Sequence, residues 1–211
     1  YGEVKKNPGL LNEYLKELES VDRQTYDSWN ENQKIAFLIN AYNALTIELI
    51  LTKYPDLESI KDLGGFFSGP WKIKFFNLLG EKTHLDHIEH GILRKQFTEP
   101  RIHFALVCAS IGCPALQTHA FTADKLDAQL SDAAKQFLRD KDRNYYDTSS
   151  KTLALSSIFK WFDEDFEKTD GSVKAFVVPY LTDNKALQKE ILSSSTKIKY
   201  LDYDWSLNQA D

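Results

Sequence analysis

The stretch IAFLINAYNALTIELIL, residues Ile35–Leu51, decides the fold more than any other part of the chain. It is apolar on nearly every side when wound as a helix, and such a helix is normally buried. Asn30 precedes it, with Gln33 three residues later, which is the pattern of a capping box. The sequence therefore predicts a long helix in the centre of the core, ending near Tyr54–Pro55.

The composition is that of a globular protein with an aromatic-rich core. The 211 residues suit a single domain spanning 1–211, with 42% hydrophobic residues and a net charge of −5. This acidic balance disfavours nucleic acid as the main partner, because phosphate binding needs a basic face. Asn40, Asn43 and Glu48 interrupt the most apolar run, so we expect no transmembrane segment.

Other patterns predict further helices and the strands of one sheet. The expected helices are Pro8–Glu19, Thr83–Lys95, Thr122–Asp140, Ile158–Phe166, Ser172–Leu181 and Asn184–Leu192. The expected strands are Trp71–Leu79, Arg101–Ser110, Asn144–Asp147 and Thr152–Leu155. Lys197–Trp205 is expected to close the chain as a strand and an aromatic tail, and Gly64–Pro70 is expected to form a tight turn. Together they predict an α+β fold with an antiparallel sheet packed against the buried central helix.

Both cysteines lie in RIHFALVCASIGCPAL, residues Arg101–Leu116. On a regular strand, His103 and Cys108 point to opposite faces, which makes Cys108 a core residue. Cys113 follows a small-residue turn that can fold back toward His103. A Cys–His pair is the minimum for a thiolate nucleophile. The alternatives are a loop cysteine without a role, a disulfide between the two cysteines and a regulatory thiol.

His84, His87 and His90 form an H-x2-H-x2-H pattern that resembles a metal site. On an α-helix, positions 84 and 90 are roughly 240° apart, so three ligands cannot reach one metal. Solvated or capping histidines are the simpler interpretation, and a zinc site made with a cysteine is the alternative. We expect no metal or other cofactor.

Glu89 is the candidate carboxylate for orienting His103, because its helix leads directly into the His103 segment. Glu31 is the rival, although a residue at this position also interacts favourably with the helix dipole. Backbone N–H groups near Gly112 are candidates for an oxyanion site.

Asn40, Asn43, Trp71 and Cys108 are the candidate ligand-contacting residues. Buried amides must be hydrogen-bonded, so Asn40 and Asn43 either tie neighbouring loops to the helix or position a substrate.

The chain resembles the domain-of-unknown-function family numbered 547. The matching pieces come in the family order: AFLINAYNAL (36–45), IEHGILR (88–94), PRIHFALVCASIGCPAL (100–116), IFKWFDEDF (158–166) and YDWSLN (203–208). The resemblance implies a papain-like cysteine-peptidase fold with a Glu–Cys–His site, and glutathione or γ-glutamyl-type ligands. The site would be rearranged, because Asn30–Lys34 holds no cysteine at the start of the central helix, where papain-like enzymes carry their nucleophile.

These observations predict a cysteine-dependent hydrolase or acyl transferase for an amide or thioester of a small peptide or γ-glutamyl-type thiol compound. Cys113 would attack, His103 would transfer protons and Glu89 would orient His103. The alternative is a non-catalytic module that binds a peptide or protein. Since the chain begins at Tyr1 rather than Met, it is expected to be either trimmed or processed. A processed chain would suit a periplasmic or secreted protein, and the sequence leaves the compartment open.

Overall fold

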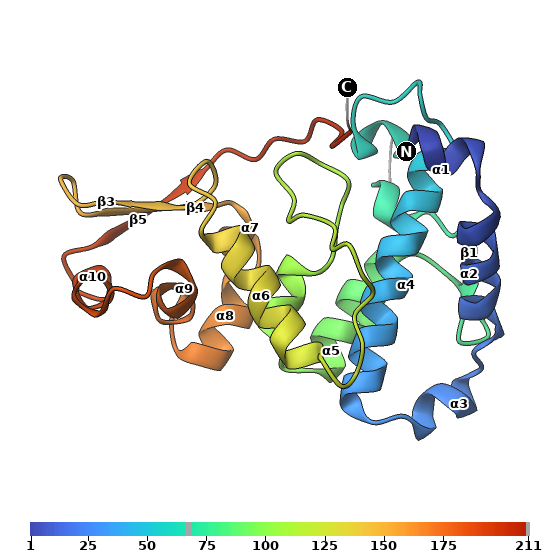
Figure 1. Ribbon diagram of the computed structural model, residues 1–211, viewed down its shortest axis with the longest axis horizontal. Coiled ribbons are helices and arrows are strands. Elements are labelled where there is room, and N and C mark those ends of the chain that lie inside the picture. Colours follow the sequence, from blue (N-terminus) through green and yellow to red (C-terminus); the bar gives the residue numbers. More distant parts are fainter. Residues whose placement is uncertain (66–68, 210–211) are drawn as a thin grey trace. The chain divides into compact units, whose positions relative to one another are not determined.

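The computed structural model describes residues 1–65 and 69–209, which fall into two compact units (Figure 1). The first unit contains Tyr1–Phe97, Leu106–Leu126 and the segment from Trp205, and the second contains Thr98–Ala105 and Asp127–Asp204. Each unit is therefore built from segments that are separated in the sequence. The description of 1–211 as one domain stays a prediction.

The long helix α4 (Glu31–Leu51) is the centre of the first unit. Its capping box is present: the Asn30 side chain accepts from the Gln33 N–H, and the Gln33 side chain accepts from the Asn30 N–H. Among the described helices, α4 alone has the length and apolar composition needed to cross a membrane, yet 67% of that window is buried, as in a core helix. The predicted buried central helix is confirmed.

Short elements surround α4, which contacts α2 and the π-helix η3. They are α1 (Gly2–Lys6), α2 (Gly9–Ser20), α3 (Arg23–Ser28), η1 (Ile60–Leu63), η2 (Pro70–Lys72), β1 (Phe76–Leu78), β2 (Glu81–Thr83), η3 (His87–Leu93) and α5 (Arg94–Gln96). The helix expected from Thr83 begins later, because Thr83 pairs with Phe76 in the β1–β2 hairpin. The turn expected at Gly64–Pro70 falls partly outside the described residues.

The second unit combines helices with a three-stranded sheet. Its elements are η4 (Pro100–Phe104), α6 (Leu126–Leu138), β3 (Tyr145–Asp147), β4 (Thr152–Ser156), α7 (Ile158–Trp161), α8 (Asp163–Asp170), α9 (Val173–Leu181), α10 (Lys185–Ile191) and β5 (Lys197–Leu201). The predicted hairpin is confirmed as β3 and β4, while β5 pairs parallel to β4. The fold is thus α+β as predicted, but this sheet is mixed rather than antiparallel.

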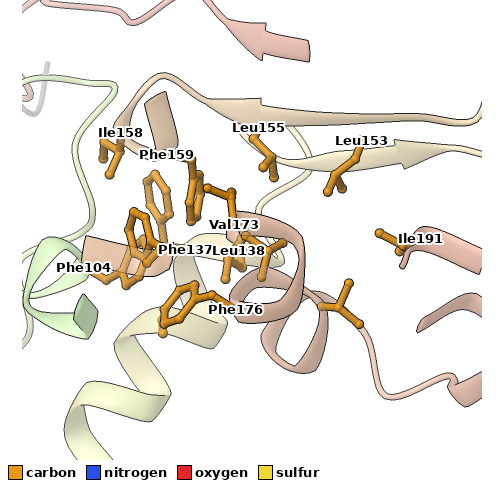
Figure 2. Close-up of a cluster of buried hydrophobic side chains, with 14 of the residues drawn as sticks. Phe104, Phe137, Leu138, Leu153, Leu155, Ile158, Phe159, Val173, Phe176 and Ile191 are labelled. Carbon is orange, nitrogen blue, oxygen red and sulfur yellow. The ribbon is translucent and has the colours of Figure 1, made fainter. Parts of the chain in front are cut away.

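Aromatic rings fill the core of the second unit, where η4, α6, α7 and α9 meet (Figure 2). The Phe104 ring lies 5.3 Å from that of Phe137 and 5.6 Å from that of Phe159, measured between centroids. Rings at such separations contribute stability beyond the area they bury. The side chain of Phe104 therefore fixes the segment that also carries His103.

The strand expected at Arg101–Ser110 is wrong, because His103 lies on the 3-10 helix η4. Pro100 stands at the start of this helix, where its missing N–H costs nothing and its fixed φ suits a helical turn. The Glu99 carboxylate caps the same turn by accepting from the Arg101 N–H. Without a regular strand, the two-residue alternation that separated His103 from Cys108 does not apply.

Candidate functional site

The segment that carries both thiols is held in the first unit from two sides. Asn43 of α4 accepts a hydrogen bond from the Val107 N–H at 2.9 Å. Farther along, Ser110 forms an isolated antiparallel bridge with Leu207, and the Asn208 N–H donates to the Ala109 carbonyl at 2.8 Å. These contacts fix the backbone on both sides of Cys108.

The turn after Cys108 brings the two sulfurs together. Ala109 has a φ of 63°, and the Cys113 N–H donates to the Ser110 carbonyl at 3.0 Å, so the chain folds back on itself. The Cys113 sulfur accepts from the Cys108 N–H at 2.8 Å and lies 3.0 Å from the Cys108 sulfur. The Ser110 hydroxyl is 3.0 Å from the Cys108 sulfur. Both cysteines are thiols rather than a disulfide, and they form one polar cluster.

The burial of Cys108 differs from the prediction. Cys108, expected in the core, is partly exposed, whereas Cys113, expected after a turn that folds back, has only 3% of its surface exposed. The turn at Ser110 brings the Cys113 sulfur against the backbone N–H and the sulfur of Cys108. Cys108 is therefore the more exposed residue of the pair.

Glu89 adds a carboxyl group to this cluster from the π-helix η3. Burial of the carboxyl and the nearby Cys108 raise the pKa of Glu89 to about 7, despite the opposing effect of a hydrogen bond from Tyr42. Burial and the Glu89 charge raise the pKa of Tyr42 well above its ordinary value. The Tyr42 hydroxyl is therefore the donor in this bond, and the carboxyl titrates near neutral pH.

Tyr1 brings a second phenol near the thiols. Burial, followed by the proximity of Cys113 and Cys108, raises the pKa of Tyr1 to about 12. Its ring lies 5.8 Å from that of Tyr54. Two protonated phenols, two thiols and one carboxyl thus occupy the same region of the first unit.

A side chain at position 91 of the π-helix that holds Glu89 would force the His87 ring to move. A Cβ at Gly91 would stand 2.3 Å from Nδ1 of His87. Single π-helical turns are frequent at functional sites.

The three histidines of this region have local partners. The His87 N–H donates to Nδ1 of His84 at 3.0 Å, and Nδ1 of His90 lies 2.8 Å from Nη1 of Arg94. Within residues 1–65 and 69–209, no three His, Cys, Asp or Glu side chains are arranged to hold a metal ion. The His84 contact agrees with the interpretation of these residues as capping histidines.

His103 belongs to the second unit and is oriented by a carboxylate that the sequence did not single out. Its Nε2 lies 2.7 Å from Oδ2 of Asp165 on α8, and its ring stacks on Phe162 with 3.8 Å between centroids. The predicted partner, Glu89, belongs to the first unit and shares a hydrogen bond with Tyr42, and its role in orienting His103 stays a prediction. The rival Glu31 lies exposed in the first turn of α4.

The two asparagines of α4 tie neighbouring segments to the helix, which confirms one of the two interpretations. Asn40 donates to the Phe121 carbonyl at 2.8 Å and accepts from the Phe121 N–H at 3.0 Å, while Asn43 holds Val107. Trp71 packs edge-on against Trp205 at 5.8 Å. Contact of these residues with a ligand stays a prediction.

The N–H groups on either side of Gly112 are engaged within the fold. The Ile111 N–H donates to the Ser206 carbonyl at 2.9 Å, and the Cys113 N–H donates to Ser110. These two groups are therefore less suited to the oxyanion role that the sequence suggested.

Three residues of chemical interest were missed from the sequence: Tyr42, Ser110 and Asp165. A signal for Tyr42 was present: it precedes Asn43 in the buried helix, and a buried hydroxyl needs a hydrogen-bond partner. Asp165 lies in the matching piece IFKWFDEDF, where three acidic side chains compete and no pattern singles one out.

Comparison with known proteins gives one match. Residues 26–138, more than half of the chain, match the family described as "Protein of unknown function, DUF547". No curated protein and no solved structure matches the chain. The matched residues include α4, Glu89 and both cysteines.

Proposed function

Since the chain belongs to the DUF547 family, whose function is unknown, we propose that it is a cysteine-dependent hydrolase or acyl transferase. The substrate would be an amide or thioester of a small peptide or γ-glutamyl-type thiol compound. The observation that carries the proposal is the partly exposed Cys108, whose thiol lies near the Glu89 carboxyl with its pKa of about 7. A general base is most effective when its pKa lies near the working pH.

The proposed reaction begins at Cys108. Glu89 takes the thiol proton, and the thiolate attacks the substrate carbonyl to form an acyl-enzyme. The proton then passes to the leaving amine or thiol, and water or an acceptor removes the acyl group from sulfur. Tyr42 keeps the Glu89 carboxyl in position through its hydrogen bond.

In this proposal Cys113 has a structural role next to Cys108. Its sulfur accepts the Cys108 N–H, which fixes the backbone of the attacking residue. The earlier expectation that Cys113 attacks with His103 as acid and base stays a prediction, and the same experiment distinguishes the two assignments.

The experiment compares Cys108→Ser, Cys113→Ser, Glu89→Gln and His103→Ala with the unchanged protein. γ-Glutamyl-p-nitroanilide and a γ-glutamyl thioester serve as probes, and iodoacetamide alkylation is followed against pH. We expect Cys108→Ser to abolish turnover and Glu89→Gln to lower it about 100-fold, the usual contribution of a general base. Full turnover by Cys108→Ser, or turnover by Glu89→Gln equal to that of the unchanged protein, would contradict the proposal.

The same proposal includes a papain-like fold. It is supported by the buried helix α4 and by the family resemblance. Because α4 starts without a cysteine, the nucleophile would come from the loop after η4. A crystal structure in which α4 and the sheet fail to superpose on papain would remove this part.

A second candidate, a peptide-binding module, is favoured by a cavity of about 570 Å³ in the second unit. This volume lies within the range of small-molecule sites, roughly 300–1,000 Å³. Its lining mixes apolar and polar side chains, among them Leu138, Arg139, Tyr145, Tyr146 and Leu187. Ligand-observed NMR with a tetrapeptide mixture tests it, with binding expected to disappear in Leu187→Asp.

A further inference from the structure

The two thiols are arranged for a reaction with each other. Their sulfurs lie 3.0 Å apart, about 1 Å beyond the ~2.05 Å of a disulfide bond. The Asn43 contact at Val107 and the Ser206 contact at Ile111 hold the backbone on either side of Cys108. Closing the bond therefore requires a small movement of two side chains rather than a rearrangement of the loop.

The two cysteines also differ in solvent exposure, which suits one to react with a substrate and the other to resolve the product. Cys108 is partly exposed and can meet a reagent from solvent, whereas Cys113 is buried with its sulfur 3.0 Å from that of Cys108. The Glu89 carboxyl and the Ser110 hydroxyl both lie close to Cys108. Cys108 is thus placed to attack, and Cys113 is placed to resolve the product.

We propose that Cys108 and Cys113 form a reversible dithiol–disulfide site for low-molecular-weight disulfides, and that its oxidation switches off the hydrolase. The second half of this inference rests on the proposed function, because it needs Cys108 as the nucleophile. The first half depends only on the geometry of the two thiols.

The exchange proceeds in two displacements. The Cys108 thiolate attacks one sulfur of a small disulfide RSSR, a mixed disulfide forms and the first RS⁻ leaves. Cys113 then gives its proton to a base and attacks the Cys108 sulfur, and the second RS⁻ leaves. Two protein thiols are oxidised, RSSR is reduced, and the two RS⁻ take up the two protons as RSH.

The test uses the full chain with hydroxyethyl disulfide in excess over mercaptoethanol, followed by acid quenching, iodoacetamide and intact-mass spectrometry. The unchanged protein should become two hydrogens lighter, carry no adduct and regain its mass with dithiothreitol. Cys113→Ser should stop at a stable mixed disulfide on Cys108. Cys108→Ser should form an adduct about tenfold more slowly or worse, because access limits exchange at the buried Cys113.

Turnover of the γ-glutamyl probes is measured on the same samples. A lasting mixed disulfide on the unchanged protein, or two reduced thiols under conditions that oxidise the denatured chain, overturns the dithiol site whatever the activity. An oxidised protein that keeps full turnover overturns the switch. Reduced protein without turnover counts against the proposed function and thus against the switch, while the masses still decide the dithiol site.

Discussion

Glu89 is a residue whose buried surroundings change its protonation near neutral pH. Its carboxyl keeps its proton to about pH 7 in the folded chain, against an ordinary value of 4.5. Between these two values the unfolded chain is deprotonated there and the folded chain is not. By linkage, the contribution of Glu89 to stability falls as pH rises from about 4.5 to about 7, and is constant above that.

Glu89→Gln should therefore remove this pH dependence. The neutral amide can still accept from Tyr42, so we expect the variant to gain stability over the unchanged protein as pH rises from 4.5 to 7. The difference is up to roughly 3 kcal/mol, from 1.36 kcal/mol for each pKa unit. Urea unfolding across this range measures it, with the exposed Glu31→Gln as control. A difference between Glu89→Gln and the unchanged protein that does not vary with pH would show that the carboxyl is charged throughout.

Only part of this cluster could be predicted from the sequence, because the remainder depends on contacts formed in the folded chain. Glu89 and the thiols were recognisable by residue type and position. The partial exposure of Cys108 was not, because it depends on the Ala109 φ of 63° and on a turn closed by backbone bonds. Tyr42 and Asp165 were missed because their partners lie far away in the sequence.

Helices whose ends are set by nearby residues were predicted well from short sequence patterns. The capping box fixed the start of α4, and hydrophobic spacing located α9 and α10 within a residue or two. The apolar run after Arg101 was wrongly predicted to be a strand, because β propensity depends on how side chains pack against neighbouring strands. Here Pro100 and the Glu99 cap start a helical turn instead. The parallel pairing of β5 with β4 follows from tertiary packing, which no short pattern encodes.

The contact between α4 and the thiol segment is one such long-range link, and its removal is expected to loosen the segment. Asn43→Ala leaves the buried Val107 N–H without its acceptor, which costs about 1–3 kcal/mol. We expect a lower midpoint of guanidinium unfolding and faster alkylation of the buried Cys113. Asn40→Ala is the matched control, because it frees Phe121 instead. Equal alkylation rates in both variants would mean that Asn43 does not restrain the thiol segment.

At the scale of the whole molecule, each compact unit draws on segments that are separated in the sequence. The family match ends at residue 138, at the end of α6, so it contains only part of either unit. The thiol segment needs Leu207 and Asn208 from beyond that limit. The matched region therefore marks where family members resemble one another rather than a unit that can fold.

A fragment limited to residues 26–138 is accordingly expected to lack a fixed tertiary structure. It keeps Phe104 but loses the rings of Phe159, Phe166 and Phe176, which lie 5.6, 6.0 and 6.0 Å from it. Each lost aromatic neighbour exposes apolar surface worth a few kcal/mol of burial. Near-ultraviolet circular dichroism and urea unfolding compare the fragment with residues 1–211, which should show a fixed aromatic signal and a cooperative transition. A fragment that unfolds cooperatively with the same midpoint would mean that the residues outside the match add little to the core, despite the rings and backbone bonds they provide.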